Sequence, residues 1–459
     1  MKFRISSFRH DHSAARRVLA VAAAVAAVNL TAHADQAWDG DTSSDFEDVA
    51  NWVGGVAPAN DTSTDIAVFG VKGSAADPQL SVSRSVRGLL FSDSSWNLSG
   101  SAGTEVLTLG AGGITATNAG SAVIAANLAF NATANPMNVA GGDVTISGVI
   151  SGNLTVPDSL NKTGTGVLTL TGANTFNHAA NAIRVSEGVL RLAGSGTLGT
   201  STAQVLIGPD SGSASATLLV DRAGYTVPNT LRVRAFGTGT HTLGAGDGLG
   251  TVTYTNTVNL GHSSTAPTNP VRLYAGTGTT VLFSNLNMTS GATNSVGITK
   301  VGLGQVQLMG TTSNYAGPTT VLEGTLRIGV ANVIPDASDV IVYGTLTMNA
   351  NETVRSLTMV SGLVNMIGTG KTLTVNSGYD VRSGTVDVIL AGSGGMVKTT
   401  DGVISLQRAN TFNGNTLVRQ GRMQFSNVSA FGSGTNGVTL GDASTAGDIQ
   451  FINLVNGGT

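Results

Sequence analysis

The chain of 459 residues contains no cysteine, so no disulfide can stabilise it. Charged residues make up only 11% of the sequence and aromatic residues 5%, and the arginines in the expected strands are scattered singly. A surface that binds nucleic acid needs clustered cations to neutralise phosphates, so we expect no nucleic-acid partner. The apolar fraction of 41% is too high for a disordered chain, and stability must therefore come from packing.

Long apolar runs are absent except near the N-terminus. Residues 1–34 have the features of a secretory signal peptide: basic residues, an apolar run over residues 18–30, and Ala32-His33-Ala34 as a cleavage site. The run is shorter than the roughly 20 residues that span a bilayer. We expect an exported mature chain from about Asp35 without a membrane-spanning segment. General secretion is the simpler route, with twin-arginine export through Arg16-Arg17 as the alternative.

Helix patterns of useful length are also missing, whereas glycine is abundant, with 62 residues. Short segments alternate apolar and polar side chains, for example Val144-Thr145-Ile146, Leu346-Thr347-Met348 and Val438-Thr439-Leu440. A period of two residues is typical of strands with one face buried and one face in water. The composition and the pattern together predict an all-β chain with many turns.

An internal repeat organises this β sequence. Three segments open with a lysine and continue into a strand pattern: Lys162-Thr163-Gly164-Thr165-Gly166-Val167-Leu168, Lys300-Val301-Gly302-Leu303-Gly304-Gln305-Val306 and Lys398-Thr399-Thr400-Asp401-Gly402-Val403-Ile404. Each leads through an asparagine and an aromatic residue to a second strand that a glycine opens. A single copy cannot bury its apolar side, so copies must stack into a solenoid, with about 20 to 25 residues per coil.

The repeat resembles the autotransporter-associated β-strand repeat, whose pattern is K-T-G-x-G-x-L-x-L-x-G-x-N-[TS]-[YF] followed by a G-T-L-x-L close. The first copy departs at residues 177–182, and the third has Thr400 in place of the first glycine. The resemblance implies a right-handed parallel β-helix that is secreted as an autotransporter passenger or a similar surface protein. In that family the repeat is implicated in passenger folding and transport, so the resemblance supplies no catalytic residue.

Three regions follow from these patterns. Residues 1–34 are the expected signal peptide. All three tryptophans precede residue 100, which predicts an N-terminal β cap over residues 35–100, because large aromatic rings can cover the open end of a core. Residues 101–459 form the expected β-solenoid, with repeats near 162–192, 300–328 and 398–425.

Several short motifs resemble sites, and each has a simpler interpretation. Gly370-Lys371-Thr372 resembles the end of a phosphate-binding loop but lacks the earlier glycine. Ser211 lies in a segment that resembles the nucleophile turn of a serine protease, but the mature chain offers only His178, His241 and His262 as bases. The acids between Asp39 and Asp48 lack the glycine and glutamate positions of a calcium loop. We therefore predict no catalytic, cofactor-binding or metal site.

Two further features of the repeats have structural interpretations. Lys162, Lys300 and Lys398 are expected to be solvent-facing corner residues. The pairs Arg232 with Arg234 and Asp380 with Arg382 are expected to serve in structural ion pairs, because residues two apart on a strand face the same side.

The sequence predicts a non-enzymatic passenger or stalk, secreted or on the outer surface of a Gram-negative-type bacterium, with an adhesive or structural role. A surface polysaccharide or another cell is the expected partner. Two alternatives stay open here: a β-helix enzyme acting on acidic polysaccharide, and a truncated, non-functional passenger. The second arises because the sequence shows no membrane barrel after the last repeat, a feature with which an autotransporter ends.

Overall fold

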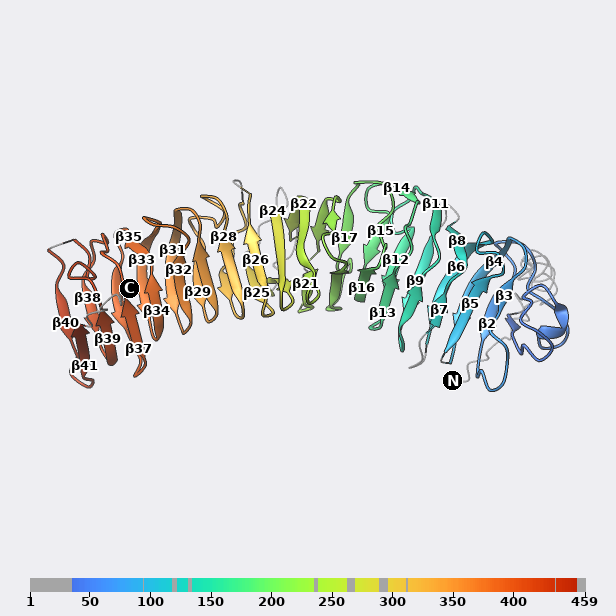
Figure 1. Cartoon of the computed structure of the whole chain (residues 1–459), viewed down its shortest axis with the longest axis horizontal. Coiled ribbons are helices and arrows are strands. Elements are labelled where there is room, and N and C mark those ends of the chain that lie inside the picture. The colour runs from blue at the N-terminus through green and yellow to red at the C-terminus, as the bar shows by residue number, and fades with distance from the viewer. Residues whose placement is uncertain are drawn as a thin grey trace, which may run out of the picture.

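The computed structural model describes residues 35–93, 95–117, 122–130, 134–234, 238–261, 269–288, 296–310, 313–433 and 435–451. The expected signal peptide therefore lies outside the described residues. The chain forms a single elongated, gently bent rod in which consecutive strands follow one another from one end to the other (Figure 1). The described residues contain one short 3-10 helix, η1 (Val49–Asn51), and otherwise strands and turns.

The strands stack into two long sheets. The first sheet contains β1 (Gln36–Ala37), β2 (Ile66–Phe69), β4 (Arg84–Phe91), β6 (Val106–Ala116), β8 (Asn127–Phe130), β9 (Asn135–Val139), β11 (Ile150–Leu154), β12 (Leu160–Thr163), β14 (Asn177–His178), β15 (Ile183–Val185), β17 (Val205–Ile207), β19 (Thr226–Val227), β20 (Leu231–Val233), β22 (Gly250–Leu260), β24 (Thr279–Met288), β26 (Gln305–Leu308), β28 (Thr325–Ile328), β30 (Thr345–Met348), β32 (Leu363–Met366), β34 (Gly384–Asp387), β37 (Val403–Leu406), β39 (Gly421–Phe425) and β41 (Gly447–Phe451).

The second sheet contains β3 (Gln79–Leu80), β5 (Trp96–Gly100), β7 (Ala122–Ile124), β10 (Val144–Ile146), β13 (Val167–Leu170), β16 (Gly188–Ala193), β18 (Ala216–Asp221), β21 (His241–Ala245), β23 (Val271–Ala275), β25 (Ile298–Val301), β27 (Thr319–Val321), β29 (Asp339–Val342), β31 (Glu352–Met359), β33 (Thr372–Val381), β35 (Ile389–Ala391), β36 (Gly395–Lys398), β38 (Thr416–Val418) and β40 (Val438–Leu440). The strand pairs of both sheets are parallel, so the chain is a parallel β-solenoid, as the repeat predicts.

The register between coils explains how the alternating pattern buries the apolar side chains. In β26, β28 and β30, the residues Val306, Leu326 and Leu346 lie directly beside one another and are fully buried. Their neighbours Gln307, Arg327 and Thr347 form the adjacent row on the outer face. Side chains alternate across a strand, so in-register stacking places every apolar row in the core.

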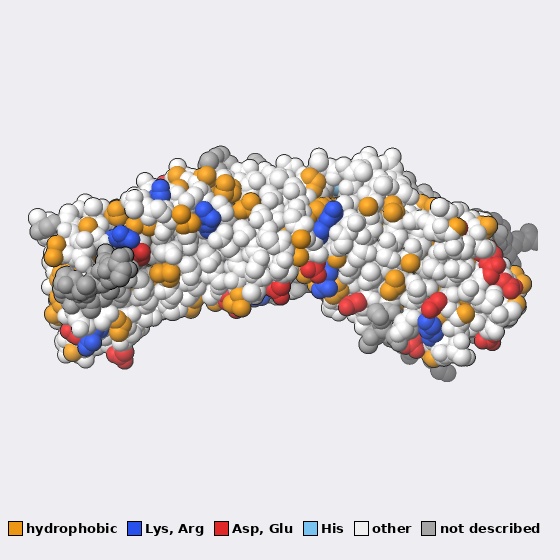
Figure 2. Space-filling view, viewed as in Figure 1, with side chains coloured by type: hydrophobic (Ala, Val, Ile, Leu, Met, Phe, Trp, Pro, Cys, Tyr) orange, Lys and Arg blue, Asp and Glu red, His pale blue; other side chains and the backbone are white. Residues whose placement is uncertain are grey.

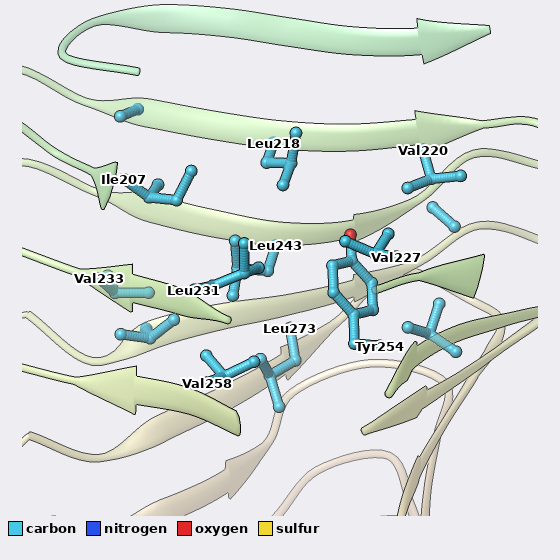
Figure 3. Packing of buried hydrophobic residues seen from close by; sticks show 14 of the residues in the cluster. Ile207, Leu218, Val220, Val227, Leu231, Val233, Leu243, Tyr254, Val258 and Leu273 are labelled. Carbon is cyan, nitrogen blue, oxygen red and sulfur yellow. The ribbon is translucent and has the colours of Figure 1, made fainter. Parts of the chain in front are cut away.

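The core runs along the rod as stacked rows of Leu, Val and Ile. Figure 3 shows one section, in which Leu218 and Leu243 from neighbouring strands of one sheet face Leu231 of the other. Tyr254 is 1% exposed there, and its hydroxyl donates to the carbonyl oxygen of Gly244 at 2.9 Å. A buried tyrosine needs such a partner, so the core accepts this polar group without an unsatisfied donor.

The first coils hold the three tryptophans. Trp38 and Phe46 both pack on Trp52, with ring centroids 5.1 and 4.9 Å apart, and the Trp52 indole donates to the Phe46 carbonyl oxygen at 2.9 Å. The stacking is continuous across the expected boundary at residue 100, since β4 pairs with β6. The division into a cap over 35–100 and a solenoid beyond it stays a prediction.

Candidate functional site: the buried lysine of each repeat

The lysine of the first repeat lies inside the turn that joins β12 to β13. Lys162 is 0% exposed, and its Nζ donates to the carbonyl oxygens of Thr163 at 2.9 Å and Gly164 at 2.6 Å. A third bond reaches the carbonyl oxygen of Glu187 in the next coil at 3.0 Å. The three donors of an ammonium group are thus all used, and the side chain joins two coils.

A glutamate completes the arrangement from the other side. The Glu187 carboxylate accepts from the backbone N–H of Gly164 at 3.2 Å. Gly188 follows it with a φ of 72°, and a Cβ there would lie 2.7 Å from Lys162 Nζ. That Cβ would also lie 2.4 Å from the carbonyl oxygen of Gly164 and 2.6 Å from that of Gly166. The glycine that opens the second strand of the repeat is therefore required both by its backbone conformation and by the space that the turn around the lysine occupies.

The second repeat has the same geometry. Lys300 is 0% exposed and donates to the carbonyl oxygens of Val301 at 2.9 Å, Gly302 at 2.6 Å and Glu323 at 3.1 Å. The Glu323 carboxylate accepts from the N–H of Gly302 at 2.9 Å. Two copies separated by several coils thus use the same four hydrogen bonds, two of which join adjacent coils.

The third repeat keeps the lysine and changes its surroundings. Lys398 is 0% exposed and donates to the carbonyl oxygen of Thr400, which replaces the first glycine, and to that of Gln420 at 3.2 Å. Gln420 stands where the other copies have glutamate, and its amide donates to Asp401. The third repeat near 398–425 therefore preserves the connection between coils with a different polar partner.

The expectation that these lysines are solvent-facing corner residues is wrong. Each lysine has the inward phase of its strand: Lys300 follows buried Ile298 by two residues, and Lys398 follows buried Met396 in the same way. A lysine can occupy that position because the turn supplies carbonyl acceptors at the end of the core, which offsets the loss of hydration.

Burial lowers the pKa of Lys162 and of Lys300 to about 8, and the carboxylates of Glu187 and Glu323 oppose that shift. The pKa of Lys398 is also lowered by burial, against the opposing charges of Asp401 and Asp380. A lysine with a lowered pKa can act as a nucleophile or base where substrate reaches it. These three are enclosed by protein, so their chemistry is structural.

The asparagines of the repeat form a second connection between coils. Asn174 accepts from the N–H of Ile150 at 2.9 Å and donates to the carbonyl oxygen of Thr197 at 2.9 Å. Asn410 does the same with Leu390 at 2.9 Å and Ala430 at 2.7 Å. These bonds span 20 to 24 residues of sequence, which agrees with the coil length expected from the repeat.

A buried polar cluster lies in the coils after the second repeat. The hydroxyl of Tyr315 bonds to that of Thr319 at 2.7 Å, and Thr319 bonds to Ser338 at 3.0 Å. Glu352 is 2% exposed, and its carboxylate accepts from the N–H of Val333 at 3.0 Å. Burial raises the pKa of Glu352 to about 7. Sequence reasoning missed this carboxylate, although its two-residue spacing from Val354 gives it the inward phase.

The sequence motifs that resemble sites do not assemble into one. Thr372 opens strand β33, so no helix N-terminus follows Gly370-Lys371. Ser211 is exposed in the loop between β17 and β18, and no hydrogen bond joins it to a histidine in the described residues. His178 and His241 are buried, and burial lowers the pKa of His241 to about 4. His262 lies outside the described residues.

The expected ion pairs are present in part. Arg382 contacts Asp380 at 2.8 Å, as the spacing predicts. Arg234 instead pairs with Asp210, a loop residue that also contacts Arg184 at 2.9 Å. Arg232 forms no ion pair among the described residues. The contacts of Asp210 join adjacent coils, whereas the pair of Asp380 and Arg382 lies within one coil.

The acids near the N-terminus bond to the chain around them. Asp48 accepts from the N–H of Ala50 at 3.0 Å at the start of η1, and Glu47 accepts from the N–H of Ser81 at 2.9 Å. Within the described ranges, no group of three or more His, Asp or Glu side chains has a geometry that could hold a metal ion.

Comparison with known proteins identifies the repeats. The model of the passenger-associated-transport repeat matches residues 160–192 and 298–328, the two segments in which a buried lysine and a glutamate join adjacent coils. The adhesin BmaC autotransporter of Brucella suis biovar 1 (strain 1330) is 35% identical over 104 residues, which are 21% of this chain and 3% of that protein. The chain thus aligns with a small part of that much longer relative. No solved structure matches the chain. The chain is thus a parallel β-solenoid that contains two passenger-associated-transport repeats and is similar, over part of its length, to an autotransporter adhesin.

Proposed function

We propose that the chain is an exported, non-enzymatic β-solenoid that acts as an adhesive or structural surface on the outside of a Gram-negative-type bacterium. The observation that carries the proposal is the pair of passenger-associated-transport repeats built into one continuous solenoid. The similarity to a protein named as an adhesin supports the adhesive role. An elongated stack of coils offers a long outer surface, which suits contact with an extended partner.

The outer surface supports a role in binding more than one in catalysis. Most of the face in Figure 2 is uncharged, and Lys, Arg, Asp and Glu side chains are dispersed over it. Many charges are paired on the surface: Arg355 with Asp339, Arg408 with Asp387 and Arg422 with Asp448. An enzyme acting on acidic polysaccharide needs unpaired acids or bases gathered where substrate binds, and these pairs do not provide them.

Export is supported by the signal-peptide pattern of residues 1–34. No helix in the described part of the chain is both long and apolar enough to cross a bilayer. We propose that the mature chain folds outside the inner membrane, where its lack of cysteine leaves packing between coils as the source of stability.

Localisation and adhesion test the proposal together. The full chain, tagged in an exposed loop, would be expressed in a Gram-negative host and followed in the cytoplasm, on intact cells and in the medium. We expect protein outside the cell and stronger attachment of expressing cells to polysaccharide-coated or cell-coated surfaces. A matched chain lacking residues 2–34 should stay in the cytoplasm. Cytoplasmic retention of the full chain would contradict the proposal, and unchanged attachment despite surface exposure would contradict the adhesive role.

Enzymatic activity is tested separately on the purified chain. Incubation with polygalacturonate and other uronic polymers should yield neither unsaturated products nor new reducing ends. Steady product formation that scales with protein concentration would contradict the non-enzymatic role.

A further inference from the structure

A groove crosses the outer face of the second sheet near the C-terminal end of the described chain. It has a volume of about 500 Å³ and lies over β31, β33, β36 and β38. Its lining includes Ser356, Gly378 and Gly395 together with Thr358, Asp380 and Leu417. Ligand sites in proteins are typically concave spaces of about 300 to 1,000 Å³, so the groove is large enough for a ligand.

Small residues form the floor of this groove. Ser356 lies beside Gly378, and Gly378 lies beside Gly395, on three successive coils. The register shifts between Val354 and Ser356, because two residues of β33, Asn376 and Ser377, lie opposite one residue of β31. The two adjacent glycines beyond this irregularity have no side chains above the backbone, which leaves a hollow in the sheet face.

A row of larger residues forms one wall. Thr358, Asp380, Val397 and Leu417 are directly opposed on four successive strands. Strands in a sheet are about 4.8 Å apart, so four of them extend about 14 Å along the axis. The groove is therefore elongated in the direction in which a linear chain could lie across the coils.

Free hydrogen-bonding groups line the groove. Within the described part of the chain, the side-chain hydroxyls of Thr358 and Ser377 make no hydrogen bond. Asn415 accepts from the N–H of Gly437 at 2.9 Å through its Oδ1, which leaves its two amide donors available. Val397 and Leu417 add apolar contact beside these groups. Hydroxyl and amide groups alternating with aliphatic surface match the hydroxyls and C–H faces of sugar rings.

The charge of the groove is balanced. Asp380 is its lining carboxylate, and it accepts from Arg382 at 2.8 Å and from the Thr399 hydroxyl at 2.8 Å. Asp339, next to Ser356, is paired with Arg355. An anionic ligand would find no uncompensated cation among the lining residues. A peptide adding as a strand would need a free sheet edge, whereas these strands are paired on both sides.

We propose that this groove binds a neutral, linear polysaccharide segment lying along the solenoid axis. The inference rests on the proposed adhesive function and names its ligand class. Thr358, Ser377 and Asn415 supply the hydrogen bonds, and Val397 and Leu417 supply the apolar contacts. The site is assigned from the shape and chemistry of the groove and involves no covalent step.

Binding to the purified full chain tests the inference. Calorimetric titrations would use neutral hexasaccharides of β-1,4-linked glucose, N-acetylglucosamine and mannose and of α-1,4-linked glucose, with hexagalacturonate and an uncharged hexapeptide as comparators. Thr358→Trp and Ser377→Trp would fill the groove from two sides. Thr320→Trp is the matched control, because Thr320 lies in the same outward row two coils earlier, outside the groove.

We expect at least one neutral hexasaccharide to bind, and each groove variant to weaken it by about tenfold, a change of about 1.4 kcal/mol. Thr320→Trp should leave the affinity unchanged. The inference is overturned if no neutral hexasaccharide binds, if both groove variants bind as wild type, or if hexagalacturonate or the peptide binds more tightly. Cell attachment that persists in the groove variants would overturn the groove as the adhesive site and leave the adhesive function standing.

Discussion

Lys300 and Glu323 connect two adjacent coils. The lysine Nζ donates to the backbone carbonyl oxygen of Glu323 at 3.1 Å, and the Glu323 carboxylate accepts from the N–H of Gly302, in the turn after the lysine, at 2.9 Å. The ammonium group therefore closes the end of the core while the carboxylate holds the turn around it. Removing one partner from such a buried group is strongly destabilising, because the remaining partners lose their hydrogen bonds and stay inaccessible to water.

Lys300→Met should loosen the second repeat. It leaves the carbonyl oxygens of Val301, Gly302 and Glu323 without their donor, which we expect to destabilise the local structure by about 3 kcal/mol. Hydrogen exchange measured by mass spectrometry should show about hundredfold faster exchange in residues 298–328. Lys371→Met is the matched control, since the Lys371 side chain forms no hydrogen bond or ion pair within the described residues. Equal protection in both variants would contradict the role of the lysine.

Asn410→Ala should separate adjacent coils in the third repeat. The substitution removes the bonds to Leu390 N–H and to the Ala430 carbonyl oxygen, and we expect a loss of about 2 to 3 kcal/mol. The thermal unfolding midpoint should fall. Asn376→Ala, at an exposed position, should leave it unchanged. A similar midpoint for both variants would show that the bridging bonds add no stability.

Gly362→Ala tests close packing between turns. Gly362 has a φ of 80°, and a Cβ there would overlap the carbonyl oxygen of Gly344 in the preceding coil. Gly368 has a φ of 77°, but nothing lies within 4 Å of its Cβ position. We expect a loss of about 1 to 2 kcal/mol for Gly368→Ala from backbone strain alone, and a distinctly larger loss for Gly362→Ala. Urea unfolding would measure both, and equal losses would rule out steric contact as the cause.

Glu352 should make stability depend on pH. Burial raises its pKa from 4.5 to about 7, so the folded chain holds a proton that the unfolded chain releases between these values. Its contribution to stability is therefore present below pH 4.5 and falls as pH rises to about 7, by about 3 kcal/mol. Burial lowers the pKa of His241 to about 4, and this residue contributes in the opposite direction. The folding stability that neutral His241 contributes is lost as the pH falls from 6.5 to about 4.

Comparison with Glu352→Gln isolates the carboxylate. The variant keeps an oxygen that can accept from Val333 N–H, and it cannot titrate. The difference in unfolding free energy between variant and wild type should grow in favour of the variant from pH 4.5 to pH 7.5. Parallel curves over that range would mean that Glu352 does not change its proton occupancy on unfolding.

The solenoid could be predicted because its determinants are local and repeated. Alternation in segments such as Leu346-Thr347-Met348 gives the buried phase directly, and the coil length follows from the repeat. The family match agrees with the repeats expected near 162–192 and 300–328.

Residue type alone predicts an exposed position for the lysines, whereas the phase of the strand predicts a buried one. Ile298 and Lys300 share one face of a strand, so the period of two already placed Lys300 inward. Two of the carbonyl oxygens that make that position acceptable belong to Val301 and Gly302 in the turn after the lysine, and the third belongs to Glu323 in the next coil. They converge on the ammonium group only once the turn has formed and the coils have stacked.

The groove could not be predicted for a different reason. Gly378 and Gly395 look like ordinary turn glycines in the sequence. The register shift between β31 and β33 places Gly378 beside Ser356, and the pairing of β33 with β36 places Gly395 beside Gly378 on the same sheet face. Concave sites in a solenoid depend on such irregularities between coils, which leave no periodic signal.

Stacking between neighbouring coils should also keep the rod intact where the polypeptide chain is cut. Ser211 and Gly212 lie in an exposed loop, while β17 and β18 on either side are each hydrogen-bonded to strands of the coils before and after them. We therefore expect a protease cut at this loop to yield two fragments that stay associated through their shared core. Such a protein would keep its length and its outer surface after nicking, in an environment where proteases are common.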